Sequence, residues 1–576
     1  MSRLQPAFSN VSTLARIAIG AAALLLVGCT LISTHSPSQA ENKPIAPPQS
    51  GLLHLDARGA SVSSPFRVKE RFVGIALSGG GSRAANFSAA ALQNLDDFGL
   101  LRGADIISSV SGGGLAGAYY ALNSPAMDWD SLRRKLDTNF LGIFLRKWAA
   151  PWHWPEVAFT DETKTDIMAD VFDEVLFSRK TYGDLPSNSP VFLANATDVT
   201  AGGERAVFSN EYFLNTLGSS LVDIRIATAV ATSAAFPGVF DSVTFQRFRP
   251  ANIFEPRGGT SPWQPPSYVH LIDGGASDNL GVETLWDAAL TELYGNAFTS
   301  MPDKLSGKPC IIISVDANAP NTSARFEHIA DERSGTDRIF NRNIFDAIDA
   351  LFEHRRQDTL IKMGLAQKEF GIFASENFGD MTEKYVDRTR VGTSEVPVNC
   401  RPEFDAVRCH VDFSKPVPPV KRLSFQCFVW HIALDEVAGV GVKLEDSSLA
   451  EFVSGKHHRD GLVRLERLVT QTETNWKLSG PENCSSEQLQ DGLYTAARVL
   501  VRDDEKSRFA LCDYILQAGL IKDPTLCKKQ FATTDVELGV TAKNPSLVNF
   551  AASVTRTENL PVRCVVPQNP LPHTEP

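Results

Sequence analysis

The sequence predicts an α/β fold whose central sheet is mainly parallel. Short apolar segments bounded by Gly, Ser or Asp recur along the chain and alternate with segments of helical pattern. Because these segments are apolar throughout, each strand needs cover on both faces, which is typical of a parallel sheet between two layers of helices. A chain with 43% hydrophobic and 21% charged residues is an ordinary globular protein, which excludes a mainly disordered or fibrous one.

Six segments are predicted as strands, and they occupy residues 72–77, 105–110, 191–195, 268–272, 310–315 and 428–434. Helices are predicted at residues 84–98, 115–122 and 224–235. The first two begin directly after glycine-containing turns, and the third is rich in alanine and ends before Pro237. The region 321–421 is polar and helical in its middle.

The first 28 residues are predicted to be a lipoprotein signal peptide. Arg3 and Arg16 precede an apolar segment at 17–27 that is too short to span a bilayer comfortably. This segment ends in Leu-Val-Gly-Cys, which resembles the lipobox of bacterial lipoproteins, so Cys29 is the expected lipidation site. The alternative is an uncleaved membrane helix extended to residue 32. Either interpretation predicts a location in the bacterial cell envelope, at the outer membrane or facing the periplasm.

The remaining chain divides by composition. Residues 29–65 are rich in Pro, Ser, Gln and Asn in their first part and are expected to be a flexible tether. Residues 66–480 are expected to form the main domain with insertions, and residues 481–576 a C-terminal extension of unknown role. The net charge of −11 gives the body no general attraction to anionic lipids or nucleic acids. An anchor, rather than surface charge, would then hold it at a membrane, and no nucleic acid is expected as a partner.

Eight further cysteines are concentrated in the last third of the chain: Cys310, Cys400, Cys409, Cys427, Cys484, Cys512, Cys527 and Cys564. No pair has the Cys-x-x-Cys spacing of a zinc site, and no metal or cofactor is expected. In an exported protein, disulfides are predicted, although Cys310 lies in an apolar strand pattern and can instead be a buried thiol. The connectivity stays open.

Three glycines, Gly79, Gly80 and Gly81, lie between the first predicted strand and the first helix. Their backbone N–H groups are unobstructed, and the helix that follows adds the positive end of its dipole, so the turn is suited to bind an anion. It can be an oxyanion hole, a phosphate cradle or a plain structural turn. No Gly-Lys-Ser/Thr ending follows, and no acid closes the next strand, which counts against a nucleotide.

Ser111 lies in a second turn between strand and helix, in Ser109-Val-Ser-Gly-Gly113-Gly. A serine nucleophile needs small neighbours so that the backbone can turn sharply, which is the reason for the G-x-S-x-G signature. Ser109 replaces the first glycine of that signature, and Gly113 keeps the second. The helix that follows is rich in Gly and Ala, which predicts close approach to a neighbouring strand. An ordinary serine in a tight turn is the alternative.

Asp273 follows an apolar strand and precedes Gly274 and Gly275. An acid at the carboxyl end of such a strand lies where sites form in open α/β sheets. Asp273 can then accept the Ser111 proton if the two strand ends are neighbours, provided that burial raises the basicity of its carboxylate. The alternative is an Asx turn that caps the loop.

The ordered set of these three motifs resembles the patatin-like phospholipase family, convincingly over residues 71–317. The resemblance implies a three-layer fold, lipid acyl hydrolysis by a serine/aspartate dyad without histidine, and no cofactor. By position, Gly79, Gly80 and Gly81 match the oxyanion loop, Arg83 the basic residue that holds the loop or meets a substrate phosphate, Ser111 the nucleophile and Asp273 the base. Ala84, where the family often has glycine, and Ser109 depart from the pattern. Membrane lipids are the expected substrates.

Several alternatives stay open. A Ser–Asp–His triad would use His431 from a late apolar strand, whereas His270 is expected on the opposite face of its strand from Asp273. The same dyad can transfer the acyl group to an acceptor other than water, or the chain can be a catalytically silent lipoprotein that binds lipids or partners. Trp148, Trp152, Trp154 and the loop 250–266 form either an apolar rim for acyl chains or membrane, or aromatic plugs packed on the body.

Overall fold

The computed structural model describes residues 42–44, 69–97, 100–124, 126–150, 163–248, 267–294, 308–318, 343–369, 372–375, 378–386, 398–403, 406–411, 422–439, 462, 465–481, 484–503, 511–512, 514 and 516. Its main strands are β1 (Phe72–Leu77), β2 (Ile106–Ser109), β3 (Val191–Asp198), β4 (Glu204–Val207), β5 (Val243–Gln246), β6 (Tyr268–Asp273), β7 (Cys310–Asp316), β10 (Phe378–Val386) and β13 (Arg422–Ala433). Two hairpins, β8 (Ala366–Glu369) with β9 (Ile372–Ser375) and β11 (Val398–Glu403) with β12 (Ala406–Val411), stand apart.

The helices that matter for the site are α2 (Gly81–Asp97), α3 (Gly113–Asn123), α4 (Trp129–Leu136), α5 (Phe140–Trp148), α7 (Lys164–Phe172), α9 (Ile226–Ser233), α10 (Gly275–Asp278), α11 (Val282–Tyr294), α13 (Asn343–Lys362) and α16 (Ser486–Arg498). Capping side chains explain several helix starts. Asp128 and Asn139, for example, accept backbone N–H groups at the starts of α4 and α5.

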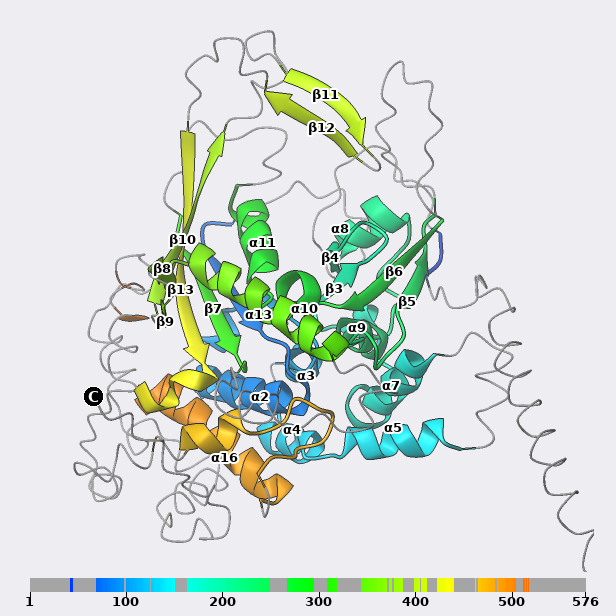
Figure 1. The fold of residues 1–576 in the computed structure, drawn as a ribbon, viewed down its shortest axis with the longest axis vertical. Coiled ribbons are helices and arrows are strands. Elements are labelled where there is room, and N and C mark those ends of the chain that lie inside the picture. Colours follow the sequence, from blue (N-terminus) through cyan, green and yellow to red (C-terminus); the bar gives the residue numbers. More distant parts are fainter. Residues whose placement is uncertain are drawn as a thin grey trace, which may run out of the picture.

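One sheet organises the molecule, with the strand order β10-β13-β7-β1-β2-β3-β6-β5 and β4 paired to β3 (Figure 1). The five central strands, β13 to β3, are parallel. β10, β4, β6 and β5 pair antiparallel with their neighbours at the two ends. The predicted mainly parallel α/β fold is confirmed.

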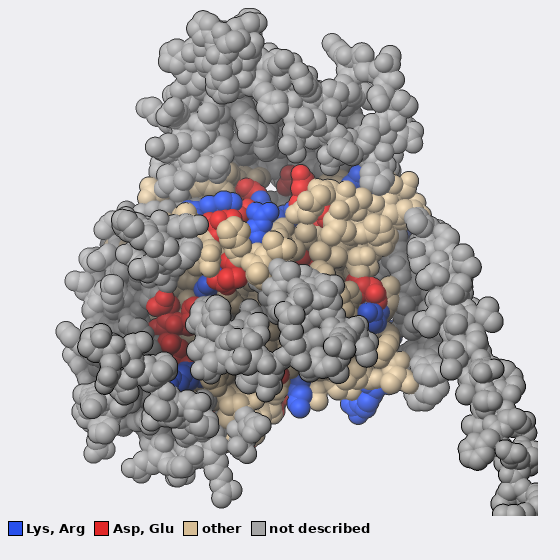
Figure 2. Space-filling view, in the orientation of Figure 1, with Lys and Arg blue, Asp and Glu red and all other residues tan. Residues whose placement is uncertain are grey.

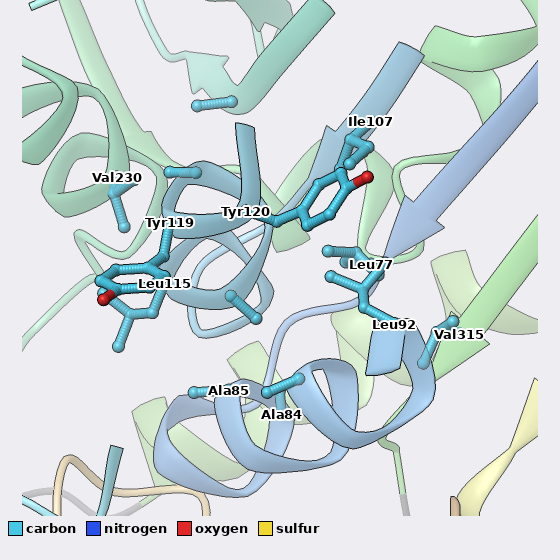
Figure 3. Packing of buried hydrophobic residues seen from close by; sticks show 14 of the residues in the cluster. Leu77, Ala84, Ala85, Leu92, Ile107, Leu115, Tyr119, Tyr120, Val230 and Val315 are labelled. Carbon is cyan, nitrogen blue, oxygen red and sulfur yellow. The ribbon is translucent and has the colours of Figure 1, made fainter. Parts of the chain in front are cut away.

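Helices cover both faces of the sheet, which makes three layers. Ile75 and Leu77 of β1 point into a core shared with α2, α3 and α9, whereas Phe72 and Ala76 point into a second core shared with α11 and α13. Figure 3 shows the first core from close by, with Leu92 of α2 beside Leu77 of β1 and Val315 of β7, and with Ala84 and Ala85 of α2 facing α3. This alternation explains why β1 is apolar on every residue, as the sequence pattern predicts.

All six predicted strands are present, with ends shifted by a few residues. β6, at the end of this mainly parallel sheet, runs antiparallel to β3. The pattern also missed β4, β5 and β10, which lie at the ends of the sheet or off its main path. β4 is partly exposed and β5 alternates between buried and half-buried residues, so neither forms an apolar run.

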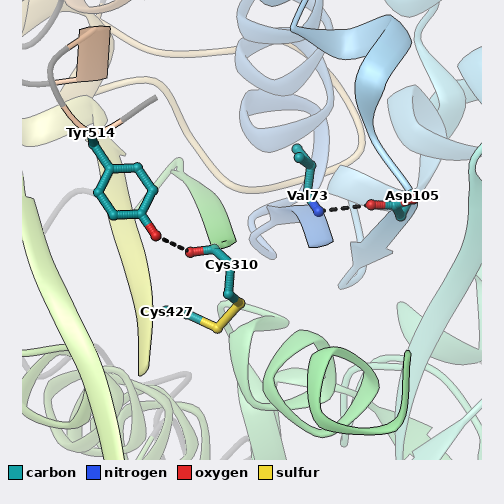
Figure 4. The surroundings of a disulfide bond; sticks show 5 residues. All are labelled: Val73, Asp105, Cys310, Cys427 and Tyr514. Carbon is teal, nitrogen blue, oxygen red and sulfur yellow. Dashed lines mark hydrogen bonds between the residues drawn. A yellow bond between two sulfur atoms is a disulfide. The ribbon is translucent and has the colours of Figure 1, made fainter. Parts of the chain in front are cut away.

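A disulfide joins Cys310 of β7 to Cys427 of β13, so Cys310 is not a free thiol (Figure 4). The carbonyl of Cys310 also accepts a hydrogen bond of 2.8 Å from the Tyr514 hydroxyl. Cys484 and Cys512 are disulfide-bonded as well. The expectation of disulfides is therefore confirmed for these four cysteines.

Some predictions fall outside the described residues, namely the signal peptide, Cys29, Trp152, Trp154 and the loop 250–266. Asn42, within the predicted tether, is buried and donates to the Gln246 carbonyl at 2.8 Å. The helices of the described ranges include none with the length and apolar character to cross a membrane.

α16 lies in the segment predicted to be a C-terminal extension. It packs against α2 and contributes Leu493 and Tyr494 to the main core. Gln490 of α16 donates to the Asn86 side chain of α2 at 2.8 Å. The start of the predicted extension therefore belongs to the same packed body as the sheet.

Candidate active site

Ser111 lies in the turn between β2 and α3 with a left-handed backbone, φ 48°. This region is unfavourable for residues other than glycine and indicates a constrained turn. The N–H of Ser111 donates to Ser233 Oγ at 2.8 Å. A Cβ on Gly113 would lie 2.8 Å from the Leu77 carbonyl oxygen, too close for any side chain. The small residues predicted around Ser111 are therefore required by packing of the turn against the end of β1.

Asp273 ends β6 beside Ser111. Its carboxylate accepts a hydrogen bond of 2.7 Å from the Gly275 N–H. Burial raises the pKa of Asp273 to about 7, although the Gly275 N–H and the nearby Ser111 side chain oppose this shift. The carboxylate is therefore a much stronger base than an exposed aspartate, as the sequence argument required.

The direction of β6 changes the reason why Asp273 reaches this position. β3 runs parallel to β2, with Ala194 opposite Ser109. β6 enters from the far side and overlaps β3 by three residues, with Asp273 opposite Ala196. Ser111 lies two residues after Ser109, and Ala196 lies two residues after Ala194. The register therefore brings Asp273 level with Ser111. An antiparallel strand thus ends at the site and delivers Asp273 to it.

The glycine loop lies directly beside this pair. A Cβ on Gly79 would be 3.6 Å from Ser111 Cβ, and both Gly80 (φ 134°) and Gly81 (φ 56°) have backbones that favour glycine. The N–H of Gly79 already donates to the Asn279 carbonyl at 3.1 Å. In the described part of the chain, no acceptor takes the N–H groups of Gly80 and Gly81. These two are therefore the better candidates for an oxyanion hole.

Arg83 is buried on α2, and its guanidinium donates to the Thr472 carbonyl at 3.0 Å. Burial lowers the pKa of Arg83 to about 10, while Asp316 and Asp435 act in the opposite direction. The neighbouring residue Ser82 makes a contact with the same segment, because its N–H donates to the Asn475 carbonyl at 2.8 Å. Arg83 thus attaches the start of α2 to a segment almost 400 residues away in the chain. This contact agrees with the predicted role of Arg83 in holding the glycine loop.

The two glycines after Asp273 are also close-packed. A Cβ on Gly274 would overlap the Asn195 carbonyl, and one on Gly275 would lie 2.7 Å from the Phe352 ring. The Asn195 side chain donates to Ser108 Oγ at 2.8 Å and to the Ser109 carbonyl at 2.9 Å. Asn195 thereby fixes the strand end that leads into Ser111.

Ser233, the last residue of α9, is a site residue that the sequence argument missed. Its hydroxyl accepts the Ser111 N–H at 2.8 Å, and its carbonyl accepts the Gly274 N–H at 3.2 Å. The Asp273 N–H donates to the carbonyl of nearby Ala235 at 3.0 Å. One helix end therefore holds both partners of the pair. Its only sequence signal was the small-residue run before Pro237.

The histidines lie elsewhere. His431 Nδ1 is 3.3 Å from Ser314 Oγ and its Nε2 is 3.5 Å from Asp316, and burial lowers its pKa to about 4. These contacts connect it to β7, which is separated from β2 by β1. His270 is on the face of β6 opposite to Asp273, as expected, and its Nδ1 is 2.8 Å from Thr244 Oγ1. The arrangement favours a pair over a triad.

Comparison with solved structures finds human GIVD cytosolic phospholipase A2, with a TM-score of 0.41 and 13% identity over 78% of this chain and 62% of that chain. Its complex with methyl gamma-linolenyl fluorophosphonate gives a TM-score of 0.38 and 16% identity, over 79% and 60%. VipD from Legionella pneumophila gives 0.23 and 13%, over 83% and 81%. This chain thus spans less than two thirds of the human enzyme's length. No curated protein matches it.

Residues 75–286 match the family model described as patatin-like phospholipase. The matched range contains the glycine loop, Ser111 and Asp273, whereas β7, β13 and α16 lie beyond it. With the three-layer α/β fold around these residues, the match identifies the chain as one that carries a patatin-like phospholipase domain.

Proposed function

We propose that the chain is a serine acyl hydrolase that cleaves lipid esters through an acyl-enzyme on Ser111, with Asp273 as the base. The patatin-like phospholipase domain supports lipid hydrolase activity in general. The observation that carries the finer proposal is the strand register that places Ser111 level with Asp273, a buried carboxylate whose pKa of about 7 the Ser111 side chain lowers.

In the proposed reaction, Asp273 takes the proton of the Ser111 hydroxyl while Oγ attacks the ester carbonyl. The resulting oxyanion accepts hydrogen bonds from Gly80 and Gly81, and the alcohol leaves with the proton from Asp273. Water then gives a proton to Asp273 and attacks the acyl-enzyme. This releases the fatty acid and returns the proton to Ser111.

We further propose that this chemistry takes place at a membrane in the bacterial cell envelope, where Cys29 carries the lipid anchor. The disulfide between Cys310 and Cys427 is consistent with folding in an oxidising compartment.

Labelling with a fluorophosphonate probe tests the proposal. Wild-type protein is expected to be labelled, and Ser111→Ala to lose both labelling and ester hydrolysis with an unchanged unfolding temperature. Asp273→Asn should lower hydrolysis by about 10³-fold or more. Ser178→Ala is the matched control, because Ser178 also has a left-handed backbone (φ 52°) but lies at the surface.

Labelling that persists in Ser111→Ala would move the nucleophile elsewhere. Wild-type protein that resists the probe and hydrolyses no ester would favour the silent binding protein. Acyl transfer to an added alcohol in preference to water would instead identify an acyltransferase on the same pair.

A further inference from the structure

Large apolar side chains are exposed on helix α5. Among the described residues, Leu145 and Trp148 are each 45% exposed, and they lie three residues apart, so they share one face of the helix. Val239, in the turn that follows α9, is 46% exposed. These three side chains, with α5, form what we call the α5 surface.

The α5 surface is connected to the candidate active site. Phe144, beside Leu145, packs edge-on against Phe240, with 5.5 Å between ring centroids. The N–H of Phe240 donates to the Phe236 carbonyl at 3.0 Å. Phe236 directly follows Ala235, whose carbonyl holds the Asp273 N–H. A single turn thus links the exposed apolar residues to the backbone of the proposed base.

The charge of this region differs from that of the whole chain. From Trp129 to Trp148, covering α4 and α5, there are five basic and two acidic residues, although the chain carries a net charge of −11. Two of the five, Arg133 and Lys147, pair with Asp491 and Glu174 of other segments. Arg134 and Arg146 are exposed, and neither has a carboxylate partner within the described residues. Figure 2 shows basic side chains along the lower edge of the described surface, over α4 and α5.

We propose that the α5 surface docks the protein onto an anionic lipid bilayer, with Trp148 and Leu145 inserted at the interface. Tryptophan is favoured at the level of the lipid headgroups, and neighbouring arginines pair with lipid phosphates. A second copy of the chain fits less well, because a two-fold contact through α5 brings the same basic side chains together. The inference rests on the proposed function in that docking here delivers lipid to Ser111.

Quenching by brominated lipid tests the docking independently of catalysis and of any N-terminal anchor. The full chain with Ser111→Ala is mixed with vesicles of phosphatidylcholine and phosphatidylglycerol that carry brominated acyl chains. Trp148→Phe should remove most of the quenched fluorescence. The matched Trp129→Phe, at a buried tryptophan, should leave it unchanged. Equal quenching in the two variants overturns the proposal.

Activity provides the second measurement. In the wild-type background, Leu145→Ser with Trp148→Ser should reduce hydrolysis of anionic vesicles at least tenfold and leave hydrolysis of a soluble short-chain ester unchanged. The control pair Val199→Ser and Ile361→Ser removes exposed apolar side chains elsewhere and should change neither rate. If Trp148 is quenched but wild-type protein hydrolyses no substrate, the proposed function fails and the docking stands. Unquenched Trp148 with normal vesicle hydrolysis, or self-association lost in the double variant, overturns the docking.

Discussion

Ser111 and Asp273 form a pair whose properties come from burial. A carboxylate removed from water keeps its proton to higher pH. Burial therefore suits Asp273 to the proposed role of base near neutral pH, but it reduces the stability of the fold. Ser111 adds its own cost through a left-handed backbone. Such costs at neighbouring residues are typical of sites that are shaped for chemistry rather than for stability.

The pKa of Asp273 predicts two pH dependences. The proposed reaction needs the ionised carboxylate, so kcat/KM should rise with pH and reach half its maximum near pH 7. The folded carboxyl keeps its proton up to about pH 7 while the unfolded one releases it near 3.8, so the free energy of unfolding falls between these values.

Asp273→Asn lacks this titration. It should therefore be more stable than wild type by roughly 2 to 4 kcal/mol above pH 7 and by little near pH 4. Denaturant unfolding at the two pH values measures the difference. An advantage that does not depend on pH would rule out burial of the charge as its cause.

These residues also mark how far the sequence could predict the site. Each of the three motifs forces a local backbone that few residues allow, so Ser111, Asp273 and the glycine loop could be found from residue types alone. Ser233 could not, because it acts through one hydroxyl and one carbonyl at the end of an ordinary alanine-rich helix. Nor could the hydrogen bond that the Gly79 N–H donates to the Asn279 carbonyl, because these two residues are 200 positions apart in the chain.

At the level of elements, the parallel strands were predictable because burial on both faces leaves an apolar run. The reversed direction of β6 was not predictable, since strand direction is set by the connection and not by the residues of the strand.

Helix α13 is held by a contact between residues that are far apart in the sequence. Arg356 Nε lies 2.6 Å from Asp316 Oδ2 at the end of β7, and both side chains are buried. Burial alone would raise the pKa of Asp316, but Arg356 and His431 hold it below its ordinary value.

Removal of this arginine tests how strongly α13 is attached. Arg356→Met leaves the Asp316 charge buried without its main partner and should cost about 3 to 5 kcal/mol of unfolding free energy. The exposed neighbour provides the control, because Arg355→Met should change stability by less than about 0.5 kcal/mol. Adding Asp316→Asn to Arg356→Met should recover part of the loss. A double variant as unstable as the single one would contradict this explanation.

At the level of the molecule, the family match and the folding unit have different bounds. β1, whose last three residues lie within residues 75–286, pairs on one side with β7, from residues 310–316. Thr472 and Asn475 hold the start of α2, and α16 packs along it. The motifs of the candidate site can be found from the sequence. The helices and segments that cover them cannot, since packing helices carry no signature beyond their apolar spacing.

A chain that ends after Gly480 is therefore expected to lose cooperative unfolding, because it exposes the core side chains that α16 covers. Within the full chain, Leu493→Ala should cost about 2 to 5 kcal/mol. Glu487→Ala, on the exposed side of the same helix, should have almost no effect. Circular dichroism during thermal unfolding measures all three. A shortened chain with the wild-type transition would show that α16 is dispensable.

The disulfide between β7 and β13 has a consequence for the lifetime of the protein. Its two cysteines are 117 residues apart, so the chain between them forms a closed covalent ring. A protease that cuts once anywhere within this ring opens it but releases no fragment, because both pieces stay joined through sulfur and through the sheet. Only reduction of the bond would allow them to separate. A nicked chain would thus persist as one molecule.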